Sequence, residues 1–153
     1  MGPRIRDEPP GGMKPATVRF YFDADILGVG KIVAGLRPDS TYPGDPGEAI
    51  HKQVRPACPI TTPRTKDPIW IPVVSQLGWL IVTRDHNIAQ HQAELDAVIA
   101  NHGRMVALAA DDAKNSWLQL ETLMIQWRKI VELTDLAGPF IYTAARTTLK
   151  KVA

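Results

Sequence analysis

The chain has little cysteine and little net charge. Cys58 is the single cysteine among 153 residues, so no disulfide can form within the chain and nothing supports secretion. We expect a cytoplasmic protein in which Cys58 is a buried or incidental thiol. The formal net charge of +2 excludes the strongly basic field of an obligate nucleic-acid-binding protein. An enzyme that processes RNA contacts few phosphates and needs no such field, so nucleases stay open.

Long hydrophobic runs and two well-known catalytic motifs are also missing. No stretch approaches the roughly 20 apolar residues that cross a bilayer, and the Pro/Gly-rich N-terminus lacks the apolar core of a signal peptide. We therefore expect no membrane partner. Gly28 and Gly30 lack the third glycine of a phosphate-binding loop, and no nucleophile elbow is present.

The chain divides into a leader and one domain. Residues 1–16 hold four prolines and three glycines without hydrophobic periodicity, which predicts a flexible leader. Residues 17–151 have the length and apolar content of a single domain with one core. Within it, residues 37–66 contain six prolines and show no clear pattern, apart from a candidate short strand in 53–60.

Strand and helix patterns alternate along this domain. The predicted strands are 17–22, 79–83, 104–109 and a last edge strand at 140–143. The predicted helices are 26–36, 69–77, 93–101 and 113 to about 133. This order predicts an α/β fold, a three-layer α/β/α Rossmann-like domain with a mostly parallel sheet and helices on both faces.

Helix ends carry their own signals. Asp67 and Pro68 form a good pair of N-cap and first helical residue, and Gly78 and Gly103 mark helix stops. The adjacent acids Asp111 and Asp112 are expected to cap the last helix. The helical spacing of Trp117, Met124 and Trp127, which Leu120 and Val131 extend, predicts packing in the core.

Four acids stand where an α/β enzyme needs them. Asp23 and Asp25 follow the first strand, Asp67 begins the helix that leads to the central strand, and Asp85 follows that strand. Each one alone is explained by helix capping. Together they would repel one another at a cost of several kcal/mol at low dielectric unless a cation is bound. Because carboxylates are hard oxygen donors, Mg²⁺ or Mn²⁺ is the simplest cation.

Such a metal site would act on phosphates. A carboxylate outside the metal's ligand set, for which Asp25 is the candidate, can orient or deprotonate the attacking water. Thr83 and Asn87 are short polar side chains suited to contact the ligands or the scissile phosphate. Arg84 and Lys31 are candidates for backbone phosphates, and solvated surface is the alternative for both.

Three segments together resemble the PIN-like nuclease domains, in particular the branch close to VapC-type toxins. They are a first strand with its acids at 20–25 (FYFDAD), the start of a helix at 66–70 (KDPIW), and a strand with Thr-x-Asp at 78–85 (GWLIVTRD). Residues 139–142 (PFIY) are similar to that branch as well. The resemblance covers residues 17 to 151.

The resemblance implies cleavage of single-stranded RNA with Mg²⁺ or Mn²⁺. It assigns the metal ligands to Asp23, Asp67 and Asp85, and it implies an antitoxin partner and a homodimer. Two positions depart from the family. Related chains often have a different polar residue at Asp25, and many have a further acid at Asn87.

Two other hypotheses stay open. Asp23-Ala24-Asp25 is similar to the nucleophile and acid pair of haloacid dehalogenase-type phosphohydrolases, although Leu27 stands where that family has Thr or Val. The third hypothesis is a domain that keeps the fold and binds RNA or protein without turnover.

Overall fold

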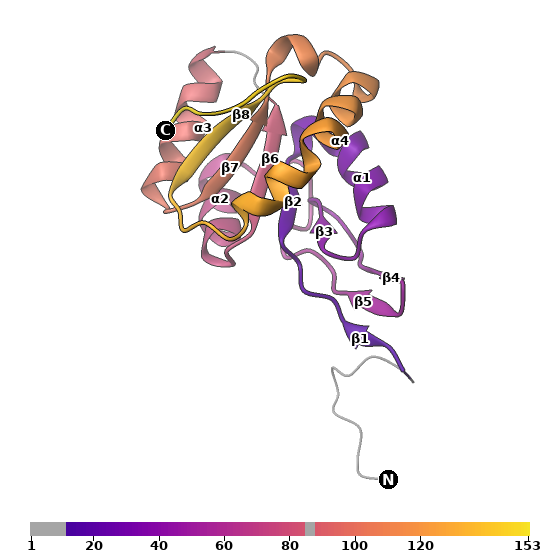
Figure 1. Cartoon of the computed structure of the whole chain (residues 1–153). Helices are drawn as coiled ribbons and strands as arrows, with labels where there is room; N and C mark the ends of the chain where they lie inside the picture. The colour runs from indigo at the N-terminus through magenta and orange to yellow at the C-terminus, as the bar shows by residue number, and fades with distance from the viewer. Residues whose placement is uncertain (1–11, 85–87) are drawn as a thin grey trace.

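The centre of the molecule is a six-stranded sheet with the order β3-β2-β6-β7-β8-β9. The structure is a computed structural model that describes residues 12–84 and 88–153 (Figure 1). The strands are β2 (Phe20–Phe22), β3 (Ser40–Thr41), β6 (Leu80–Arg84), β7 (Arg104–Leu108), β8 (Phe140–Ala144) and β9 (Leu149–Lys151). Neighbouring strands run parallel except for β8 and β9. The predicted mostly parallel sheet is therefore confirmed.

Helices cover both faces of the sheet. α1 (Leu27–Leu36) and α4 (Ser116–Leu133) lie on one face, and α2 (Asp67–Gln76) and α3 (Ile88–Ala100) lie on the other (Figure 1). Alternate strand residues supply the two cores: Phe20 packs with Trp127 of α4, and Tyr21 packs with Trp70 of α2. The α/β/α fold is thus confirmed. None of the described helices is long and apolar enough to cross a bilayer.

The predicted core stripe of α4 is wrong for two of its residues. Trp117 is 75% exposed and Met124 is 69% exposed, whereas the buried side of the helix includes Gln119, Thr122 and Gln126. These polar side chains donate hydrogen bonds to backbone carbonyls of Asp112 and Ala113 before α4 and of Ala145 after β8. Because their polar atoms are satisfied, they can be buried in place of apolar residues.

Three predicted helix boundaries are corrected. Lys66 is the N-cap residue of α2, so Asp67 is its first helical residue. Asn115 caps α4 by accepting from the Leu118 N–H at 2.9 Å, whereas Asp111 and Asp112 lie in the short 3₁₀ helix η2 (Ala110–Asp112). At the end of α3, the left-handed residue is His102 with φ 55° and not Gly103. Gly78, with φ 75°, ends α2 as predicted.

The last predicted strand is not at the edge of the sheet. β8 lies between β7 and β9, and β9 pairs with it in the antiparallel direction. The prediction missed β9 because it is three residues long and two of those residues are charged.

The proline-rich segment 37–66 supplies two strands of a second, small sheet with the order β1-β5-β4. The strands are β1 (Lys14–Pro15), β4 (Glu48–Ile50) and β5 (Gln53–Arg55). The candidate strand in 53–60 is thereby confirmed at Gln53–Arg55. β1 lies within residues 1–16, the predicted flexible leader, for which no strand was expected.

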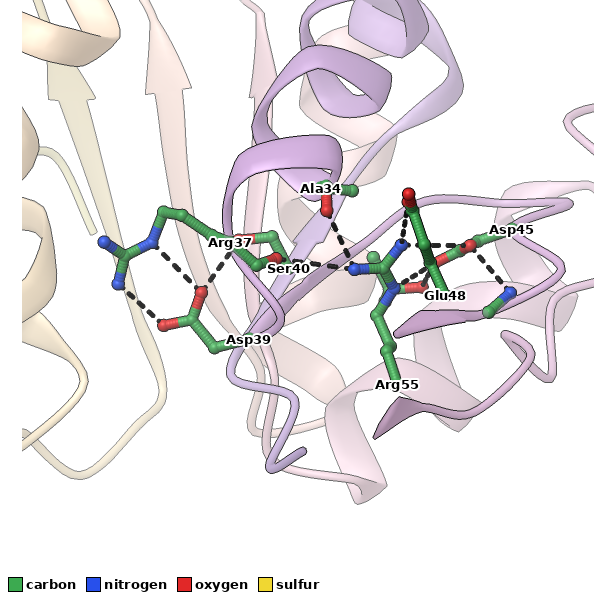
Figure 2. A network of polar contacts seen from close by, with 9 residues as sticks. Ala34, Arg37, Asp39, Ser40, Asp45, Glu48 and Arg55 are labelled. Atoms are coloured by element: carbon green, nitrogen blue, oxygen red, sulfur yellow. Dashed lines mark hydrogen bonds and ion pairs between the residues drawn. The ribbon is translucent and has the colours of Figure 1, made fainter. Parts of the chain in front are cut away.

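A buried ion pair fixes this segment to α1. Arg55 Nε lies 2.6 Å from Asp45 Oδ2, and both side chains are 1% exposed. Arg55 Nη1 also donates to the Ala34 carbonyl at 2.9 Å, near the end of α1 (Figure 2). Thr41 donates to the same Asp45 carboxylate. The Arg55–Asp45 pair therefore joins α1, β3 and β5 into one unit.

Candidate functional site

Asp23 stands at the carboxyl ends of two neighbouring parallel strands. It follows β2 directly, and its backbone N–H donates to the Val82 carbonyl of β6 at 2.9 Å. Its Oδ1 accepts from the Ala24 N–H at 2.6 Å and so begins the 3₁₀ helix η1 (Ala24–Ile26). The side chain is 7% exposed. The carboxylate thus lies at the edge where open α/β sheets bind ligands.

Asp25 is joined to the end of β6. Its Oδ2 accepts from Thr83 Oγ1 at 2.7 Å and from the Arg84 N–H at 3.4 Å. Thr83 Oγ1 also lies 3.3 Å from Asp23 Oδ2. Because a hydroxyl has one hydrogen, Thr83 donates to only one of these carboxylates at a time.

Asp67 reaches the same site from α2. Its Oδ1 accepts from the indole N–H of Trp70 at 2.9 Å, and Trp70 is buried. The Asp67 side chain is exposed, although its carboxylate is held by this bond. Trp70 therefore orients the carboxylate of Asp67, the residue that the sequence analysis expected as the N-cap of this helix.

Sequence reasoning missed Glu94, a buried acid on α3. Glu94 is 2% exposed and shares a buried face of α3 with Val98, four residues later. The signal in the sequence is the spacing of four residues between this acid and an apolar residue, which puts both on the same side of a helix. Glu94 lines the same pocket of about 380 Å³ as the three aspartates. The pocket is lined by Asp23, Ala24, Asp25, Pro63, Thr65, Asp67, Trp70, Ala93 and Glu94.

Burial and mutual repulsion make these acids weak. Burial, together with the charges of Asp25 and Asp67, raises the pKa of Asp23 to about 8. Burial, together with the charges of all three aspartates, raises the pKa of Glu94 to about 9. Both carboxyl groups hold protons at neutral pH unless a positive charge replaces them.

Two basic residues lie beside this pocket. A neighbouring hollow shares Pro63, Thr65 and Asp67 with it and is also lined by Arg64 and Lys66. Both basic side chains are exposed. The loop before α2 therefore places positive charge next to the cluster of acids, where a phosphate backbone could bind.

The other predicted site residues have different positions. Thr83 is fully buried behind the carboxylates, so it contacts Asp23 and Asp25 and does not face a substrate. Arg84 is half-buried. Lys31 is exposed on α1 and is not among the described residues that line the pocket. Asp85 and Asn87 lie outside the described residues, and their roles stay predictions.

The donor chemistry of the pocket fits a divalent cation. Carboxylate oxygens are the ligands that Mg²⁺ and Mn²⁺ prefer. A cation would also relieve the repulsion that raises the pKa of Asp23 and Glu94. Among the residues that the structure describes, no three such side chains are already close enough to hold a metal ion. Binding would need these side chains to draw together.

A match to a protein-family model shows which family this chain belongs to. A model described as a PIN-like domain matches residues 19–110. This chain belongs to the PIN-like domain family. PIN-like domains are typically nucleases, and they generally use divalent metal ions. Neither a curated protein nor a solved structure matches the chain. The matched segment of this PIN-like domain runs from β2 to the residues after β7 and contains the whole pocket.

Proposed function

We propose that this PIN-like domain is a metal-dependent endoribonuclease that hydrolyses phosphodiester bonds of single-stranded RNA. One observation carries the proposal: four acids, placed directly after β2, in η1, in α2 and in α3, line one pocket at the carboxyl edge of the sheet. The RNA specificity rests on the resemblance to VapC-type toxins.

The metal in this proposal is Mg²⁺ or Mn²⁺. Asp23, Asp67 and Glu94 would hold it, and Asp85 is a further predicted ligand. When bound, the ion supplies charge neutralisation for the carboxylates and polarises a phosphate oxygen. Asp23 and Glu94 are buried, so they gain most from that neutralisation.

The remaining residues bind and orient the reactants. Asp25 is held by Thr83 and the Arg84 N–H, so it is the carboxylate that we assign to orienting and deprotonating the attacking water. Arg64 and Lys66 flank the pocket and bind phosphates on one side of the scissile bond. Lys31 and the Arg84 side chain remain candidates for phosphates farther along the strand.

The test is cleavage of an unstructured, end-labelled RNA with Mg²⁺, with Mn²⁺ and with EDTA. We expect cleavage that needs the metal and falls at least about 100-fold in Asp23→Asn and Glu94→Gln. Asp96→Asn is the matched control, because Asp96 is an exposed acid on the same helix as Glu94 and should leave the rate unchanged.

Other outcomes would replace the proposal. Turnover of a small phosphate ester with covalent phosphate on Asp23 would indicate the dehalogenase-type phosphohydrolase. RNA binding without cleavage under any metal would indicate a non-catalytic domain. Preference for single-stranded DNA of the same sequence would contradict the RNA specificity.

We also propose that the protein is the toxin of a toxin–antitoxin pair and acts in the cytoplasm. This role rests on the resemblance to VapC-type toxins. Induced expression should arrest growth, and co-expression of a small DNA-binding protein from the neighbouring reading frame should relieve the arrest. Relief by Asp23→Asn would link the arrest to the pocket, and growth without arrest would contradict the toxin role.

A further inference from the structure

The side chain of Arg84 leaves the sheet on the face of α1 and α4, away from the pocket of acids. Consecutive residues of a strand point to opposite faces, and Thr83 points to Asp23 and Asp25. Val82, two residues before Arg84, packs in the core beneath α1 and α4. Arg84 therefore points to that face at the carboxyl end of β6, where Thr83 next to it points into the pocket.

The guanidinium of Arg84 has no partner among residues 12–84 and 88–153. Its Nε is buried, and the side chain forms neither a hydrogen bond nor an ion pair with a described residue. A buried charged donor without a partner destabilises the fold unless a ligand accepts its hydrogen bonds. The position of this guanidinium therefore favours an anion from outside the chain.

The first turn of α4 offers further donors on the same face. Asn115 accepts from the Leu118 N–H, which leaves the N–H groups of Ser116 and Trp117 without a partner in the described part of the chain. This turn contains no acid, and the start of an 18-residue helix attracts negative charge. It lies beside the start of α1, since a Cβ on Gly28 would stand 3.2 Å from Ser116 Oγ.

Trp117 is the one exposed Trp, Tyr or Phe side chain in the part of the chain that the structure describes, with an exposed fraction of 75%. Beside its ring is a hollow of about 260 Å³, lined by Trp117, Leu120, Glu121, Met124 and Ile125. Helical side chains lean toward the N-terminus of their helix, and α4 begins at the carboxyl edge of the sheet. The indole therefore leans toward the edge that holds the pocket of acids.

These features together fit one nucleotide of a single strand. Proteins that bind single-stranded nucleic acid hold the backbone with positive charge and stack bases on aromatic rings. Here Arg84 and the N–H groups of α4 offer donors to a phosphate, and the Trp117 ring offers a face to a base. A partner protein could fill the apolar hollow as well, but it gives no reason for an unpaired guanidinium on the same face.

We infer that Arg84, the first turn of α4 and Trp117 form a second nucleotide-binding site, in which the phosphate binds Arg84 and the base stacks on Trp117. This site adjoins the pocket of acids, because the Arg84 N–H donates to Asp25 of that pocket. The RNA then passes from the loop before α2, over the pocket, to the start of α4. The inference rests on the proposed ribonuclease function and adds the path of the strand to it.

The salt dependence of RNA binding separates the two contacts. Fluorescence anisotropy measures the Kd of the full chain for a labelled, unstructured RNA with Mg²⁺, in the Asp23→Asn background so that the RNA stays intact. Trp117→Ala should raise the Kd about 5- to 150-fold at every salt concentration, because stacking releases no counterions. Arg84→Gln should raise it roughly tenfold and reduce the slope of log Kd against log salt by about 0.7.

Matched controls and an abasic RNA complete the test. Leu77→Ala removes an apolar side chain that is 50% exposed at the other end of the sheet, and Arg128→Gln removes an exposed charge near the far end of α4. Both should leave the Kd unchanged. In an RNA series with one abasic position, one position should weaken binding to the parent protein and not to Trp117→Ala, since the base and the ring form one contact.

The outcomes distinguish this site from the proposed function. If the wild type cleaves RNA but Trp117→Ala and Arg84→Gln bind it as the parent does, the second site is wrong and the ribonuclease stands. If the chain binds no single-stranded RNA at all, both are wrong. Equal losses in the variants and their controls would also overturn the site. Arg84→Lys keeps the charge and should retain most of the affinity, and circular dichroism separates loss of binding from loss of folding.

Discussion

Thr83 on β6 and Asp25 in η1 are joined by a hydrogen bond of 2.7 Å, and the same hydroxyl lies 3.3 Å from Asp23. Thr83 is fully buried, so this bond is made where it is shielded from water. The threonine therefore acts on a substrate only through the two carboxylates that it holds.

Removing this hydroxyl should impair the site without unfolding it. Thr83→Val keeps the volume but loses the donor, so the two aspartates lose the hydrogen bond that favours their charged forms. We expect an approximately 10- to 100-fold loss of metal affinity or cleavage rate, measured by calorimetry with Mn²⁺ and by RNA cleavage. Thr83→Ser restores the hydroxyl and should recover most of the loss. Equal behaviour of the two variants would contradict the role of the hydroxyl.

Trp70 should act as a positioning residue for Asp67. Trp70→Phe keeps a buried aromatic ring but removes the N–H that donates to Asp67 at 2.9 Å. We expect Mn²⁺ binding to weaken roughly tenfold, since the carboxylate loses its orientation. Trp79→Phe is the matched control, because Trp79 also stacks on Tyr21 but is outside the pocket. A similar loss in both variants would point to packing alone.

Metal-free protein should lose stability as the pH rises. The pKa of Glu94 in the fold is about 9 and its ordinary value is 4.5, so the folded state binds more protons between these values. A group that binds more protons in the folded state makes folding less favourable as the pH increases. The melting temperature of the metal-free protein should therefore fall from about pH 5 to about pH 9.

Glu94→Gln should remove part of this pH dependence. The amide carries no charge, so at pH 8 the metal-free variant should melt roughly 3 °C above the wild type. Added Mn²⁺ should stabilise the wild type more than the variant. Differential scanning fluorimetry at several pH values measures both effects, and Asp96→Asn should follow the wild-type curve. A melting temperature that rises with pH would contradict the protonated state of Glu94.

The buried Arg55–Asp45 pair should matter for stability and not for chemistry. Arg55→Ala leaves Asp45 buried without its cation, and we expect a loss of about 3–5 kcal/mol in the free energy of unfolding by urea. Arg55→Met combined with Asp45→Leu should recover much of it, because both charges are then gone. The exposed pair of Arg146 and Asp112 should contribute less than about 1 kcal/mol.

The parts of the fold that the sequence predicted are those with simple apolar patterns. β2, β6 and β7 are buried on both faces of a parallel sheet, so their runs of apolar residues are distinctive. β3 and β4 are two and three residues long, and tertiary contacts such as the Arg55–Asp45 pair set their positions. Local pattern carries no information about such contacts.

The errors at the site and on α4 have a common cause. Glu94 is a charged residue that the fold buries, and Trp117 is an apolar residue that the fold exposes. A periodicity argument assigns the first to solvent and the second to the core. Glu94 is an exception where the protein has a use for it, in the pocket of acids.

The burial of Asp23 and Glu94 has a further consequence for how the protein handles cations. Two acids of the pocket carry protons at neutral pH, and their carboxylates must be released before they can act as ligands. Loading a metal is then an ion exchange that acidifies the solution, and the apparent affinity should change with pH as it does for a weak-acid chelator. Calorimetry in buffers of different ionisation enthalpy would count the protons released.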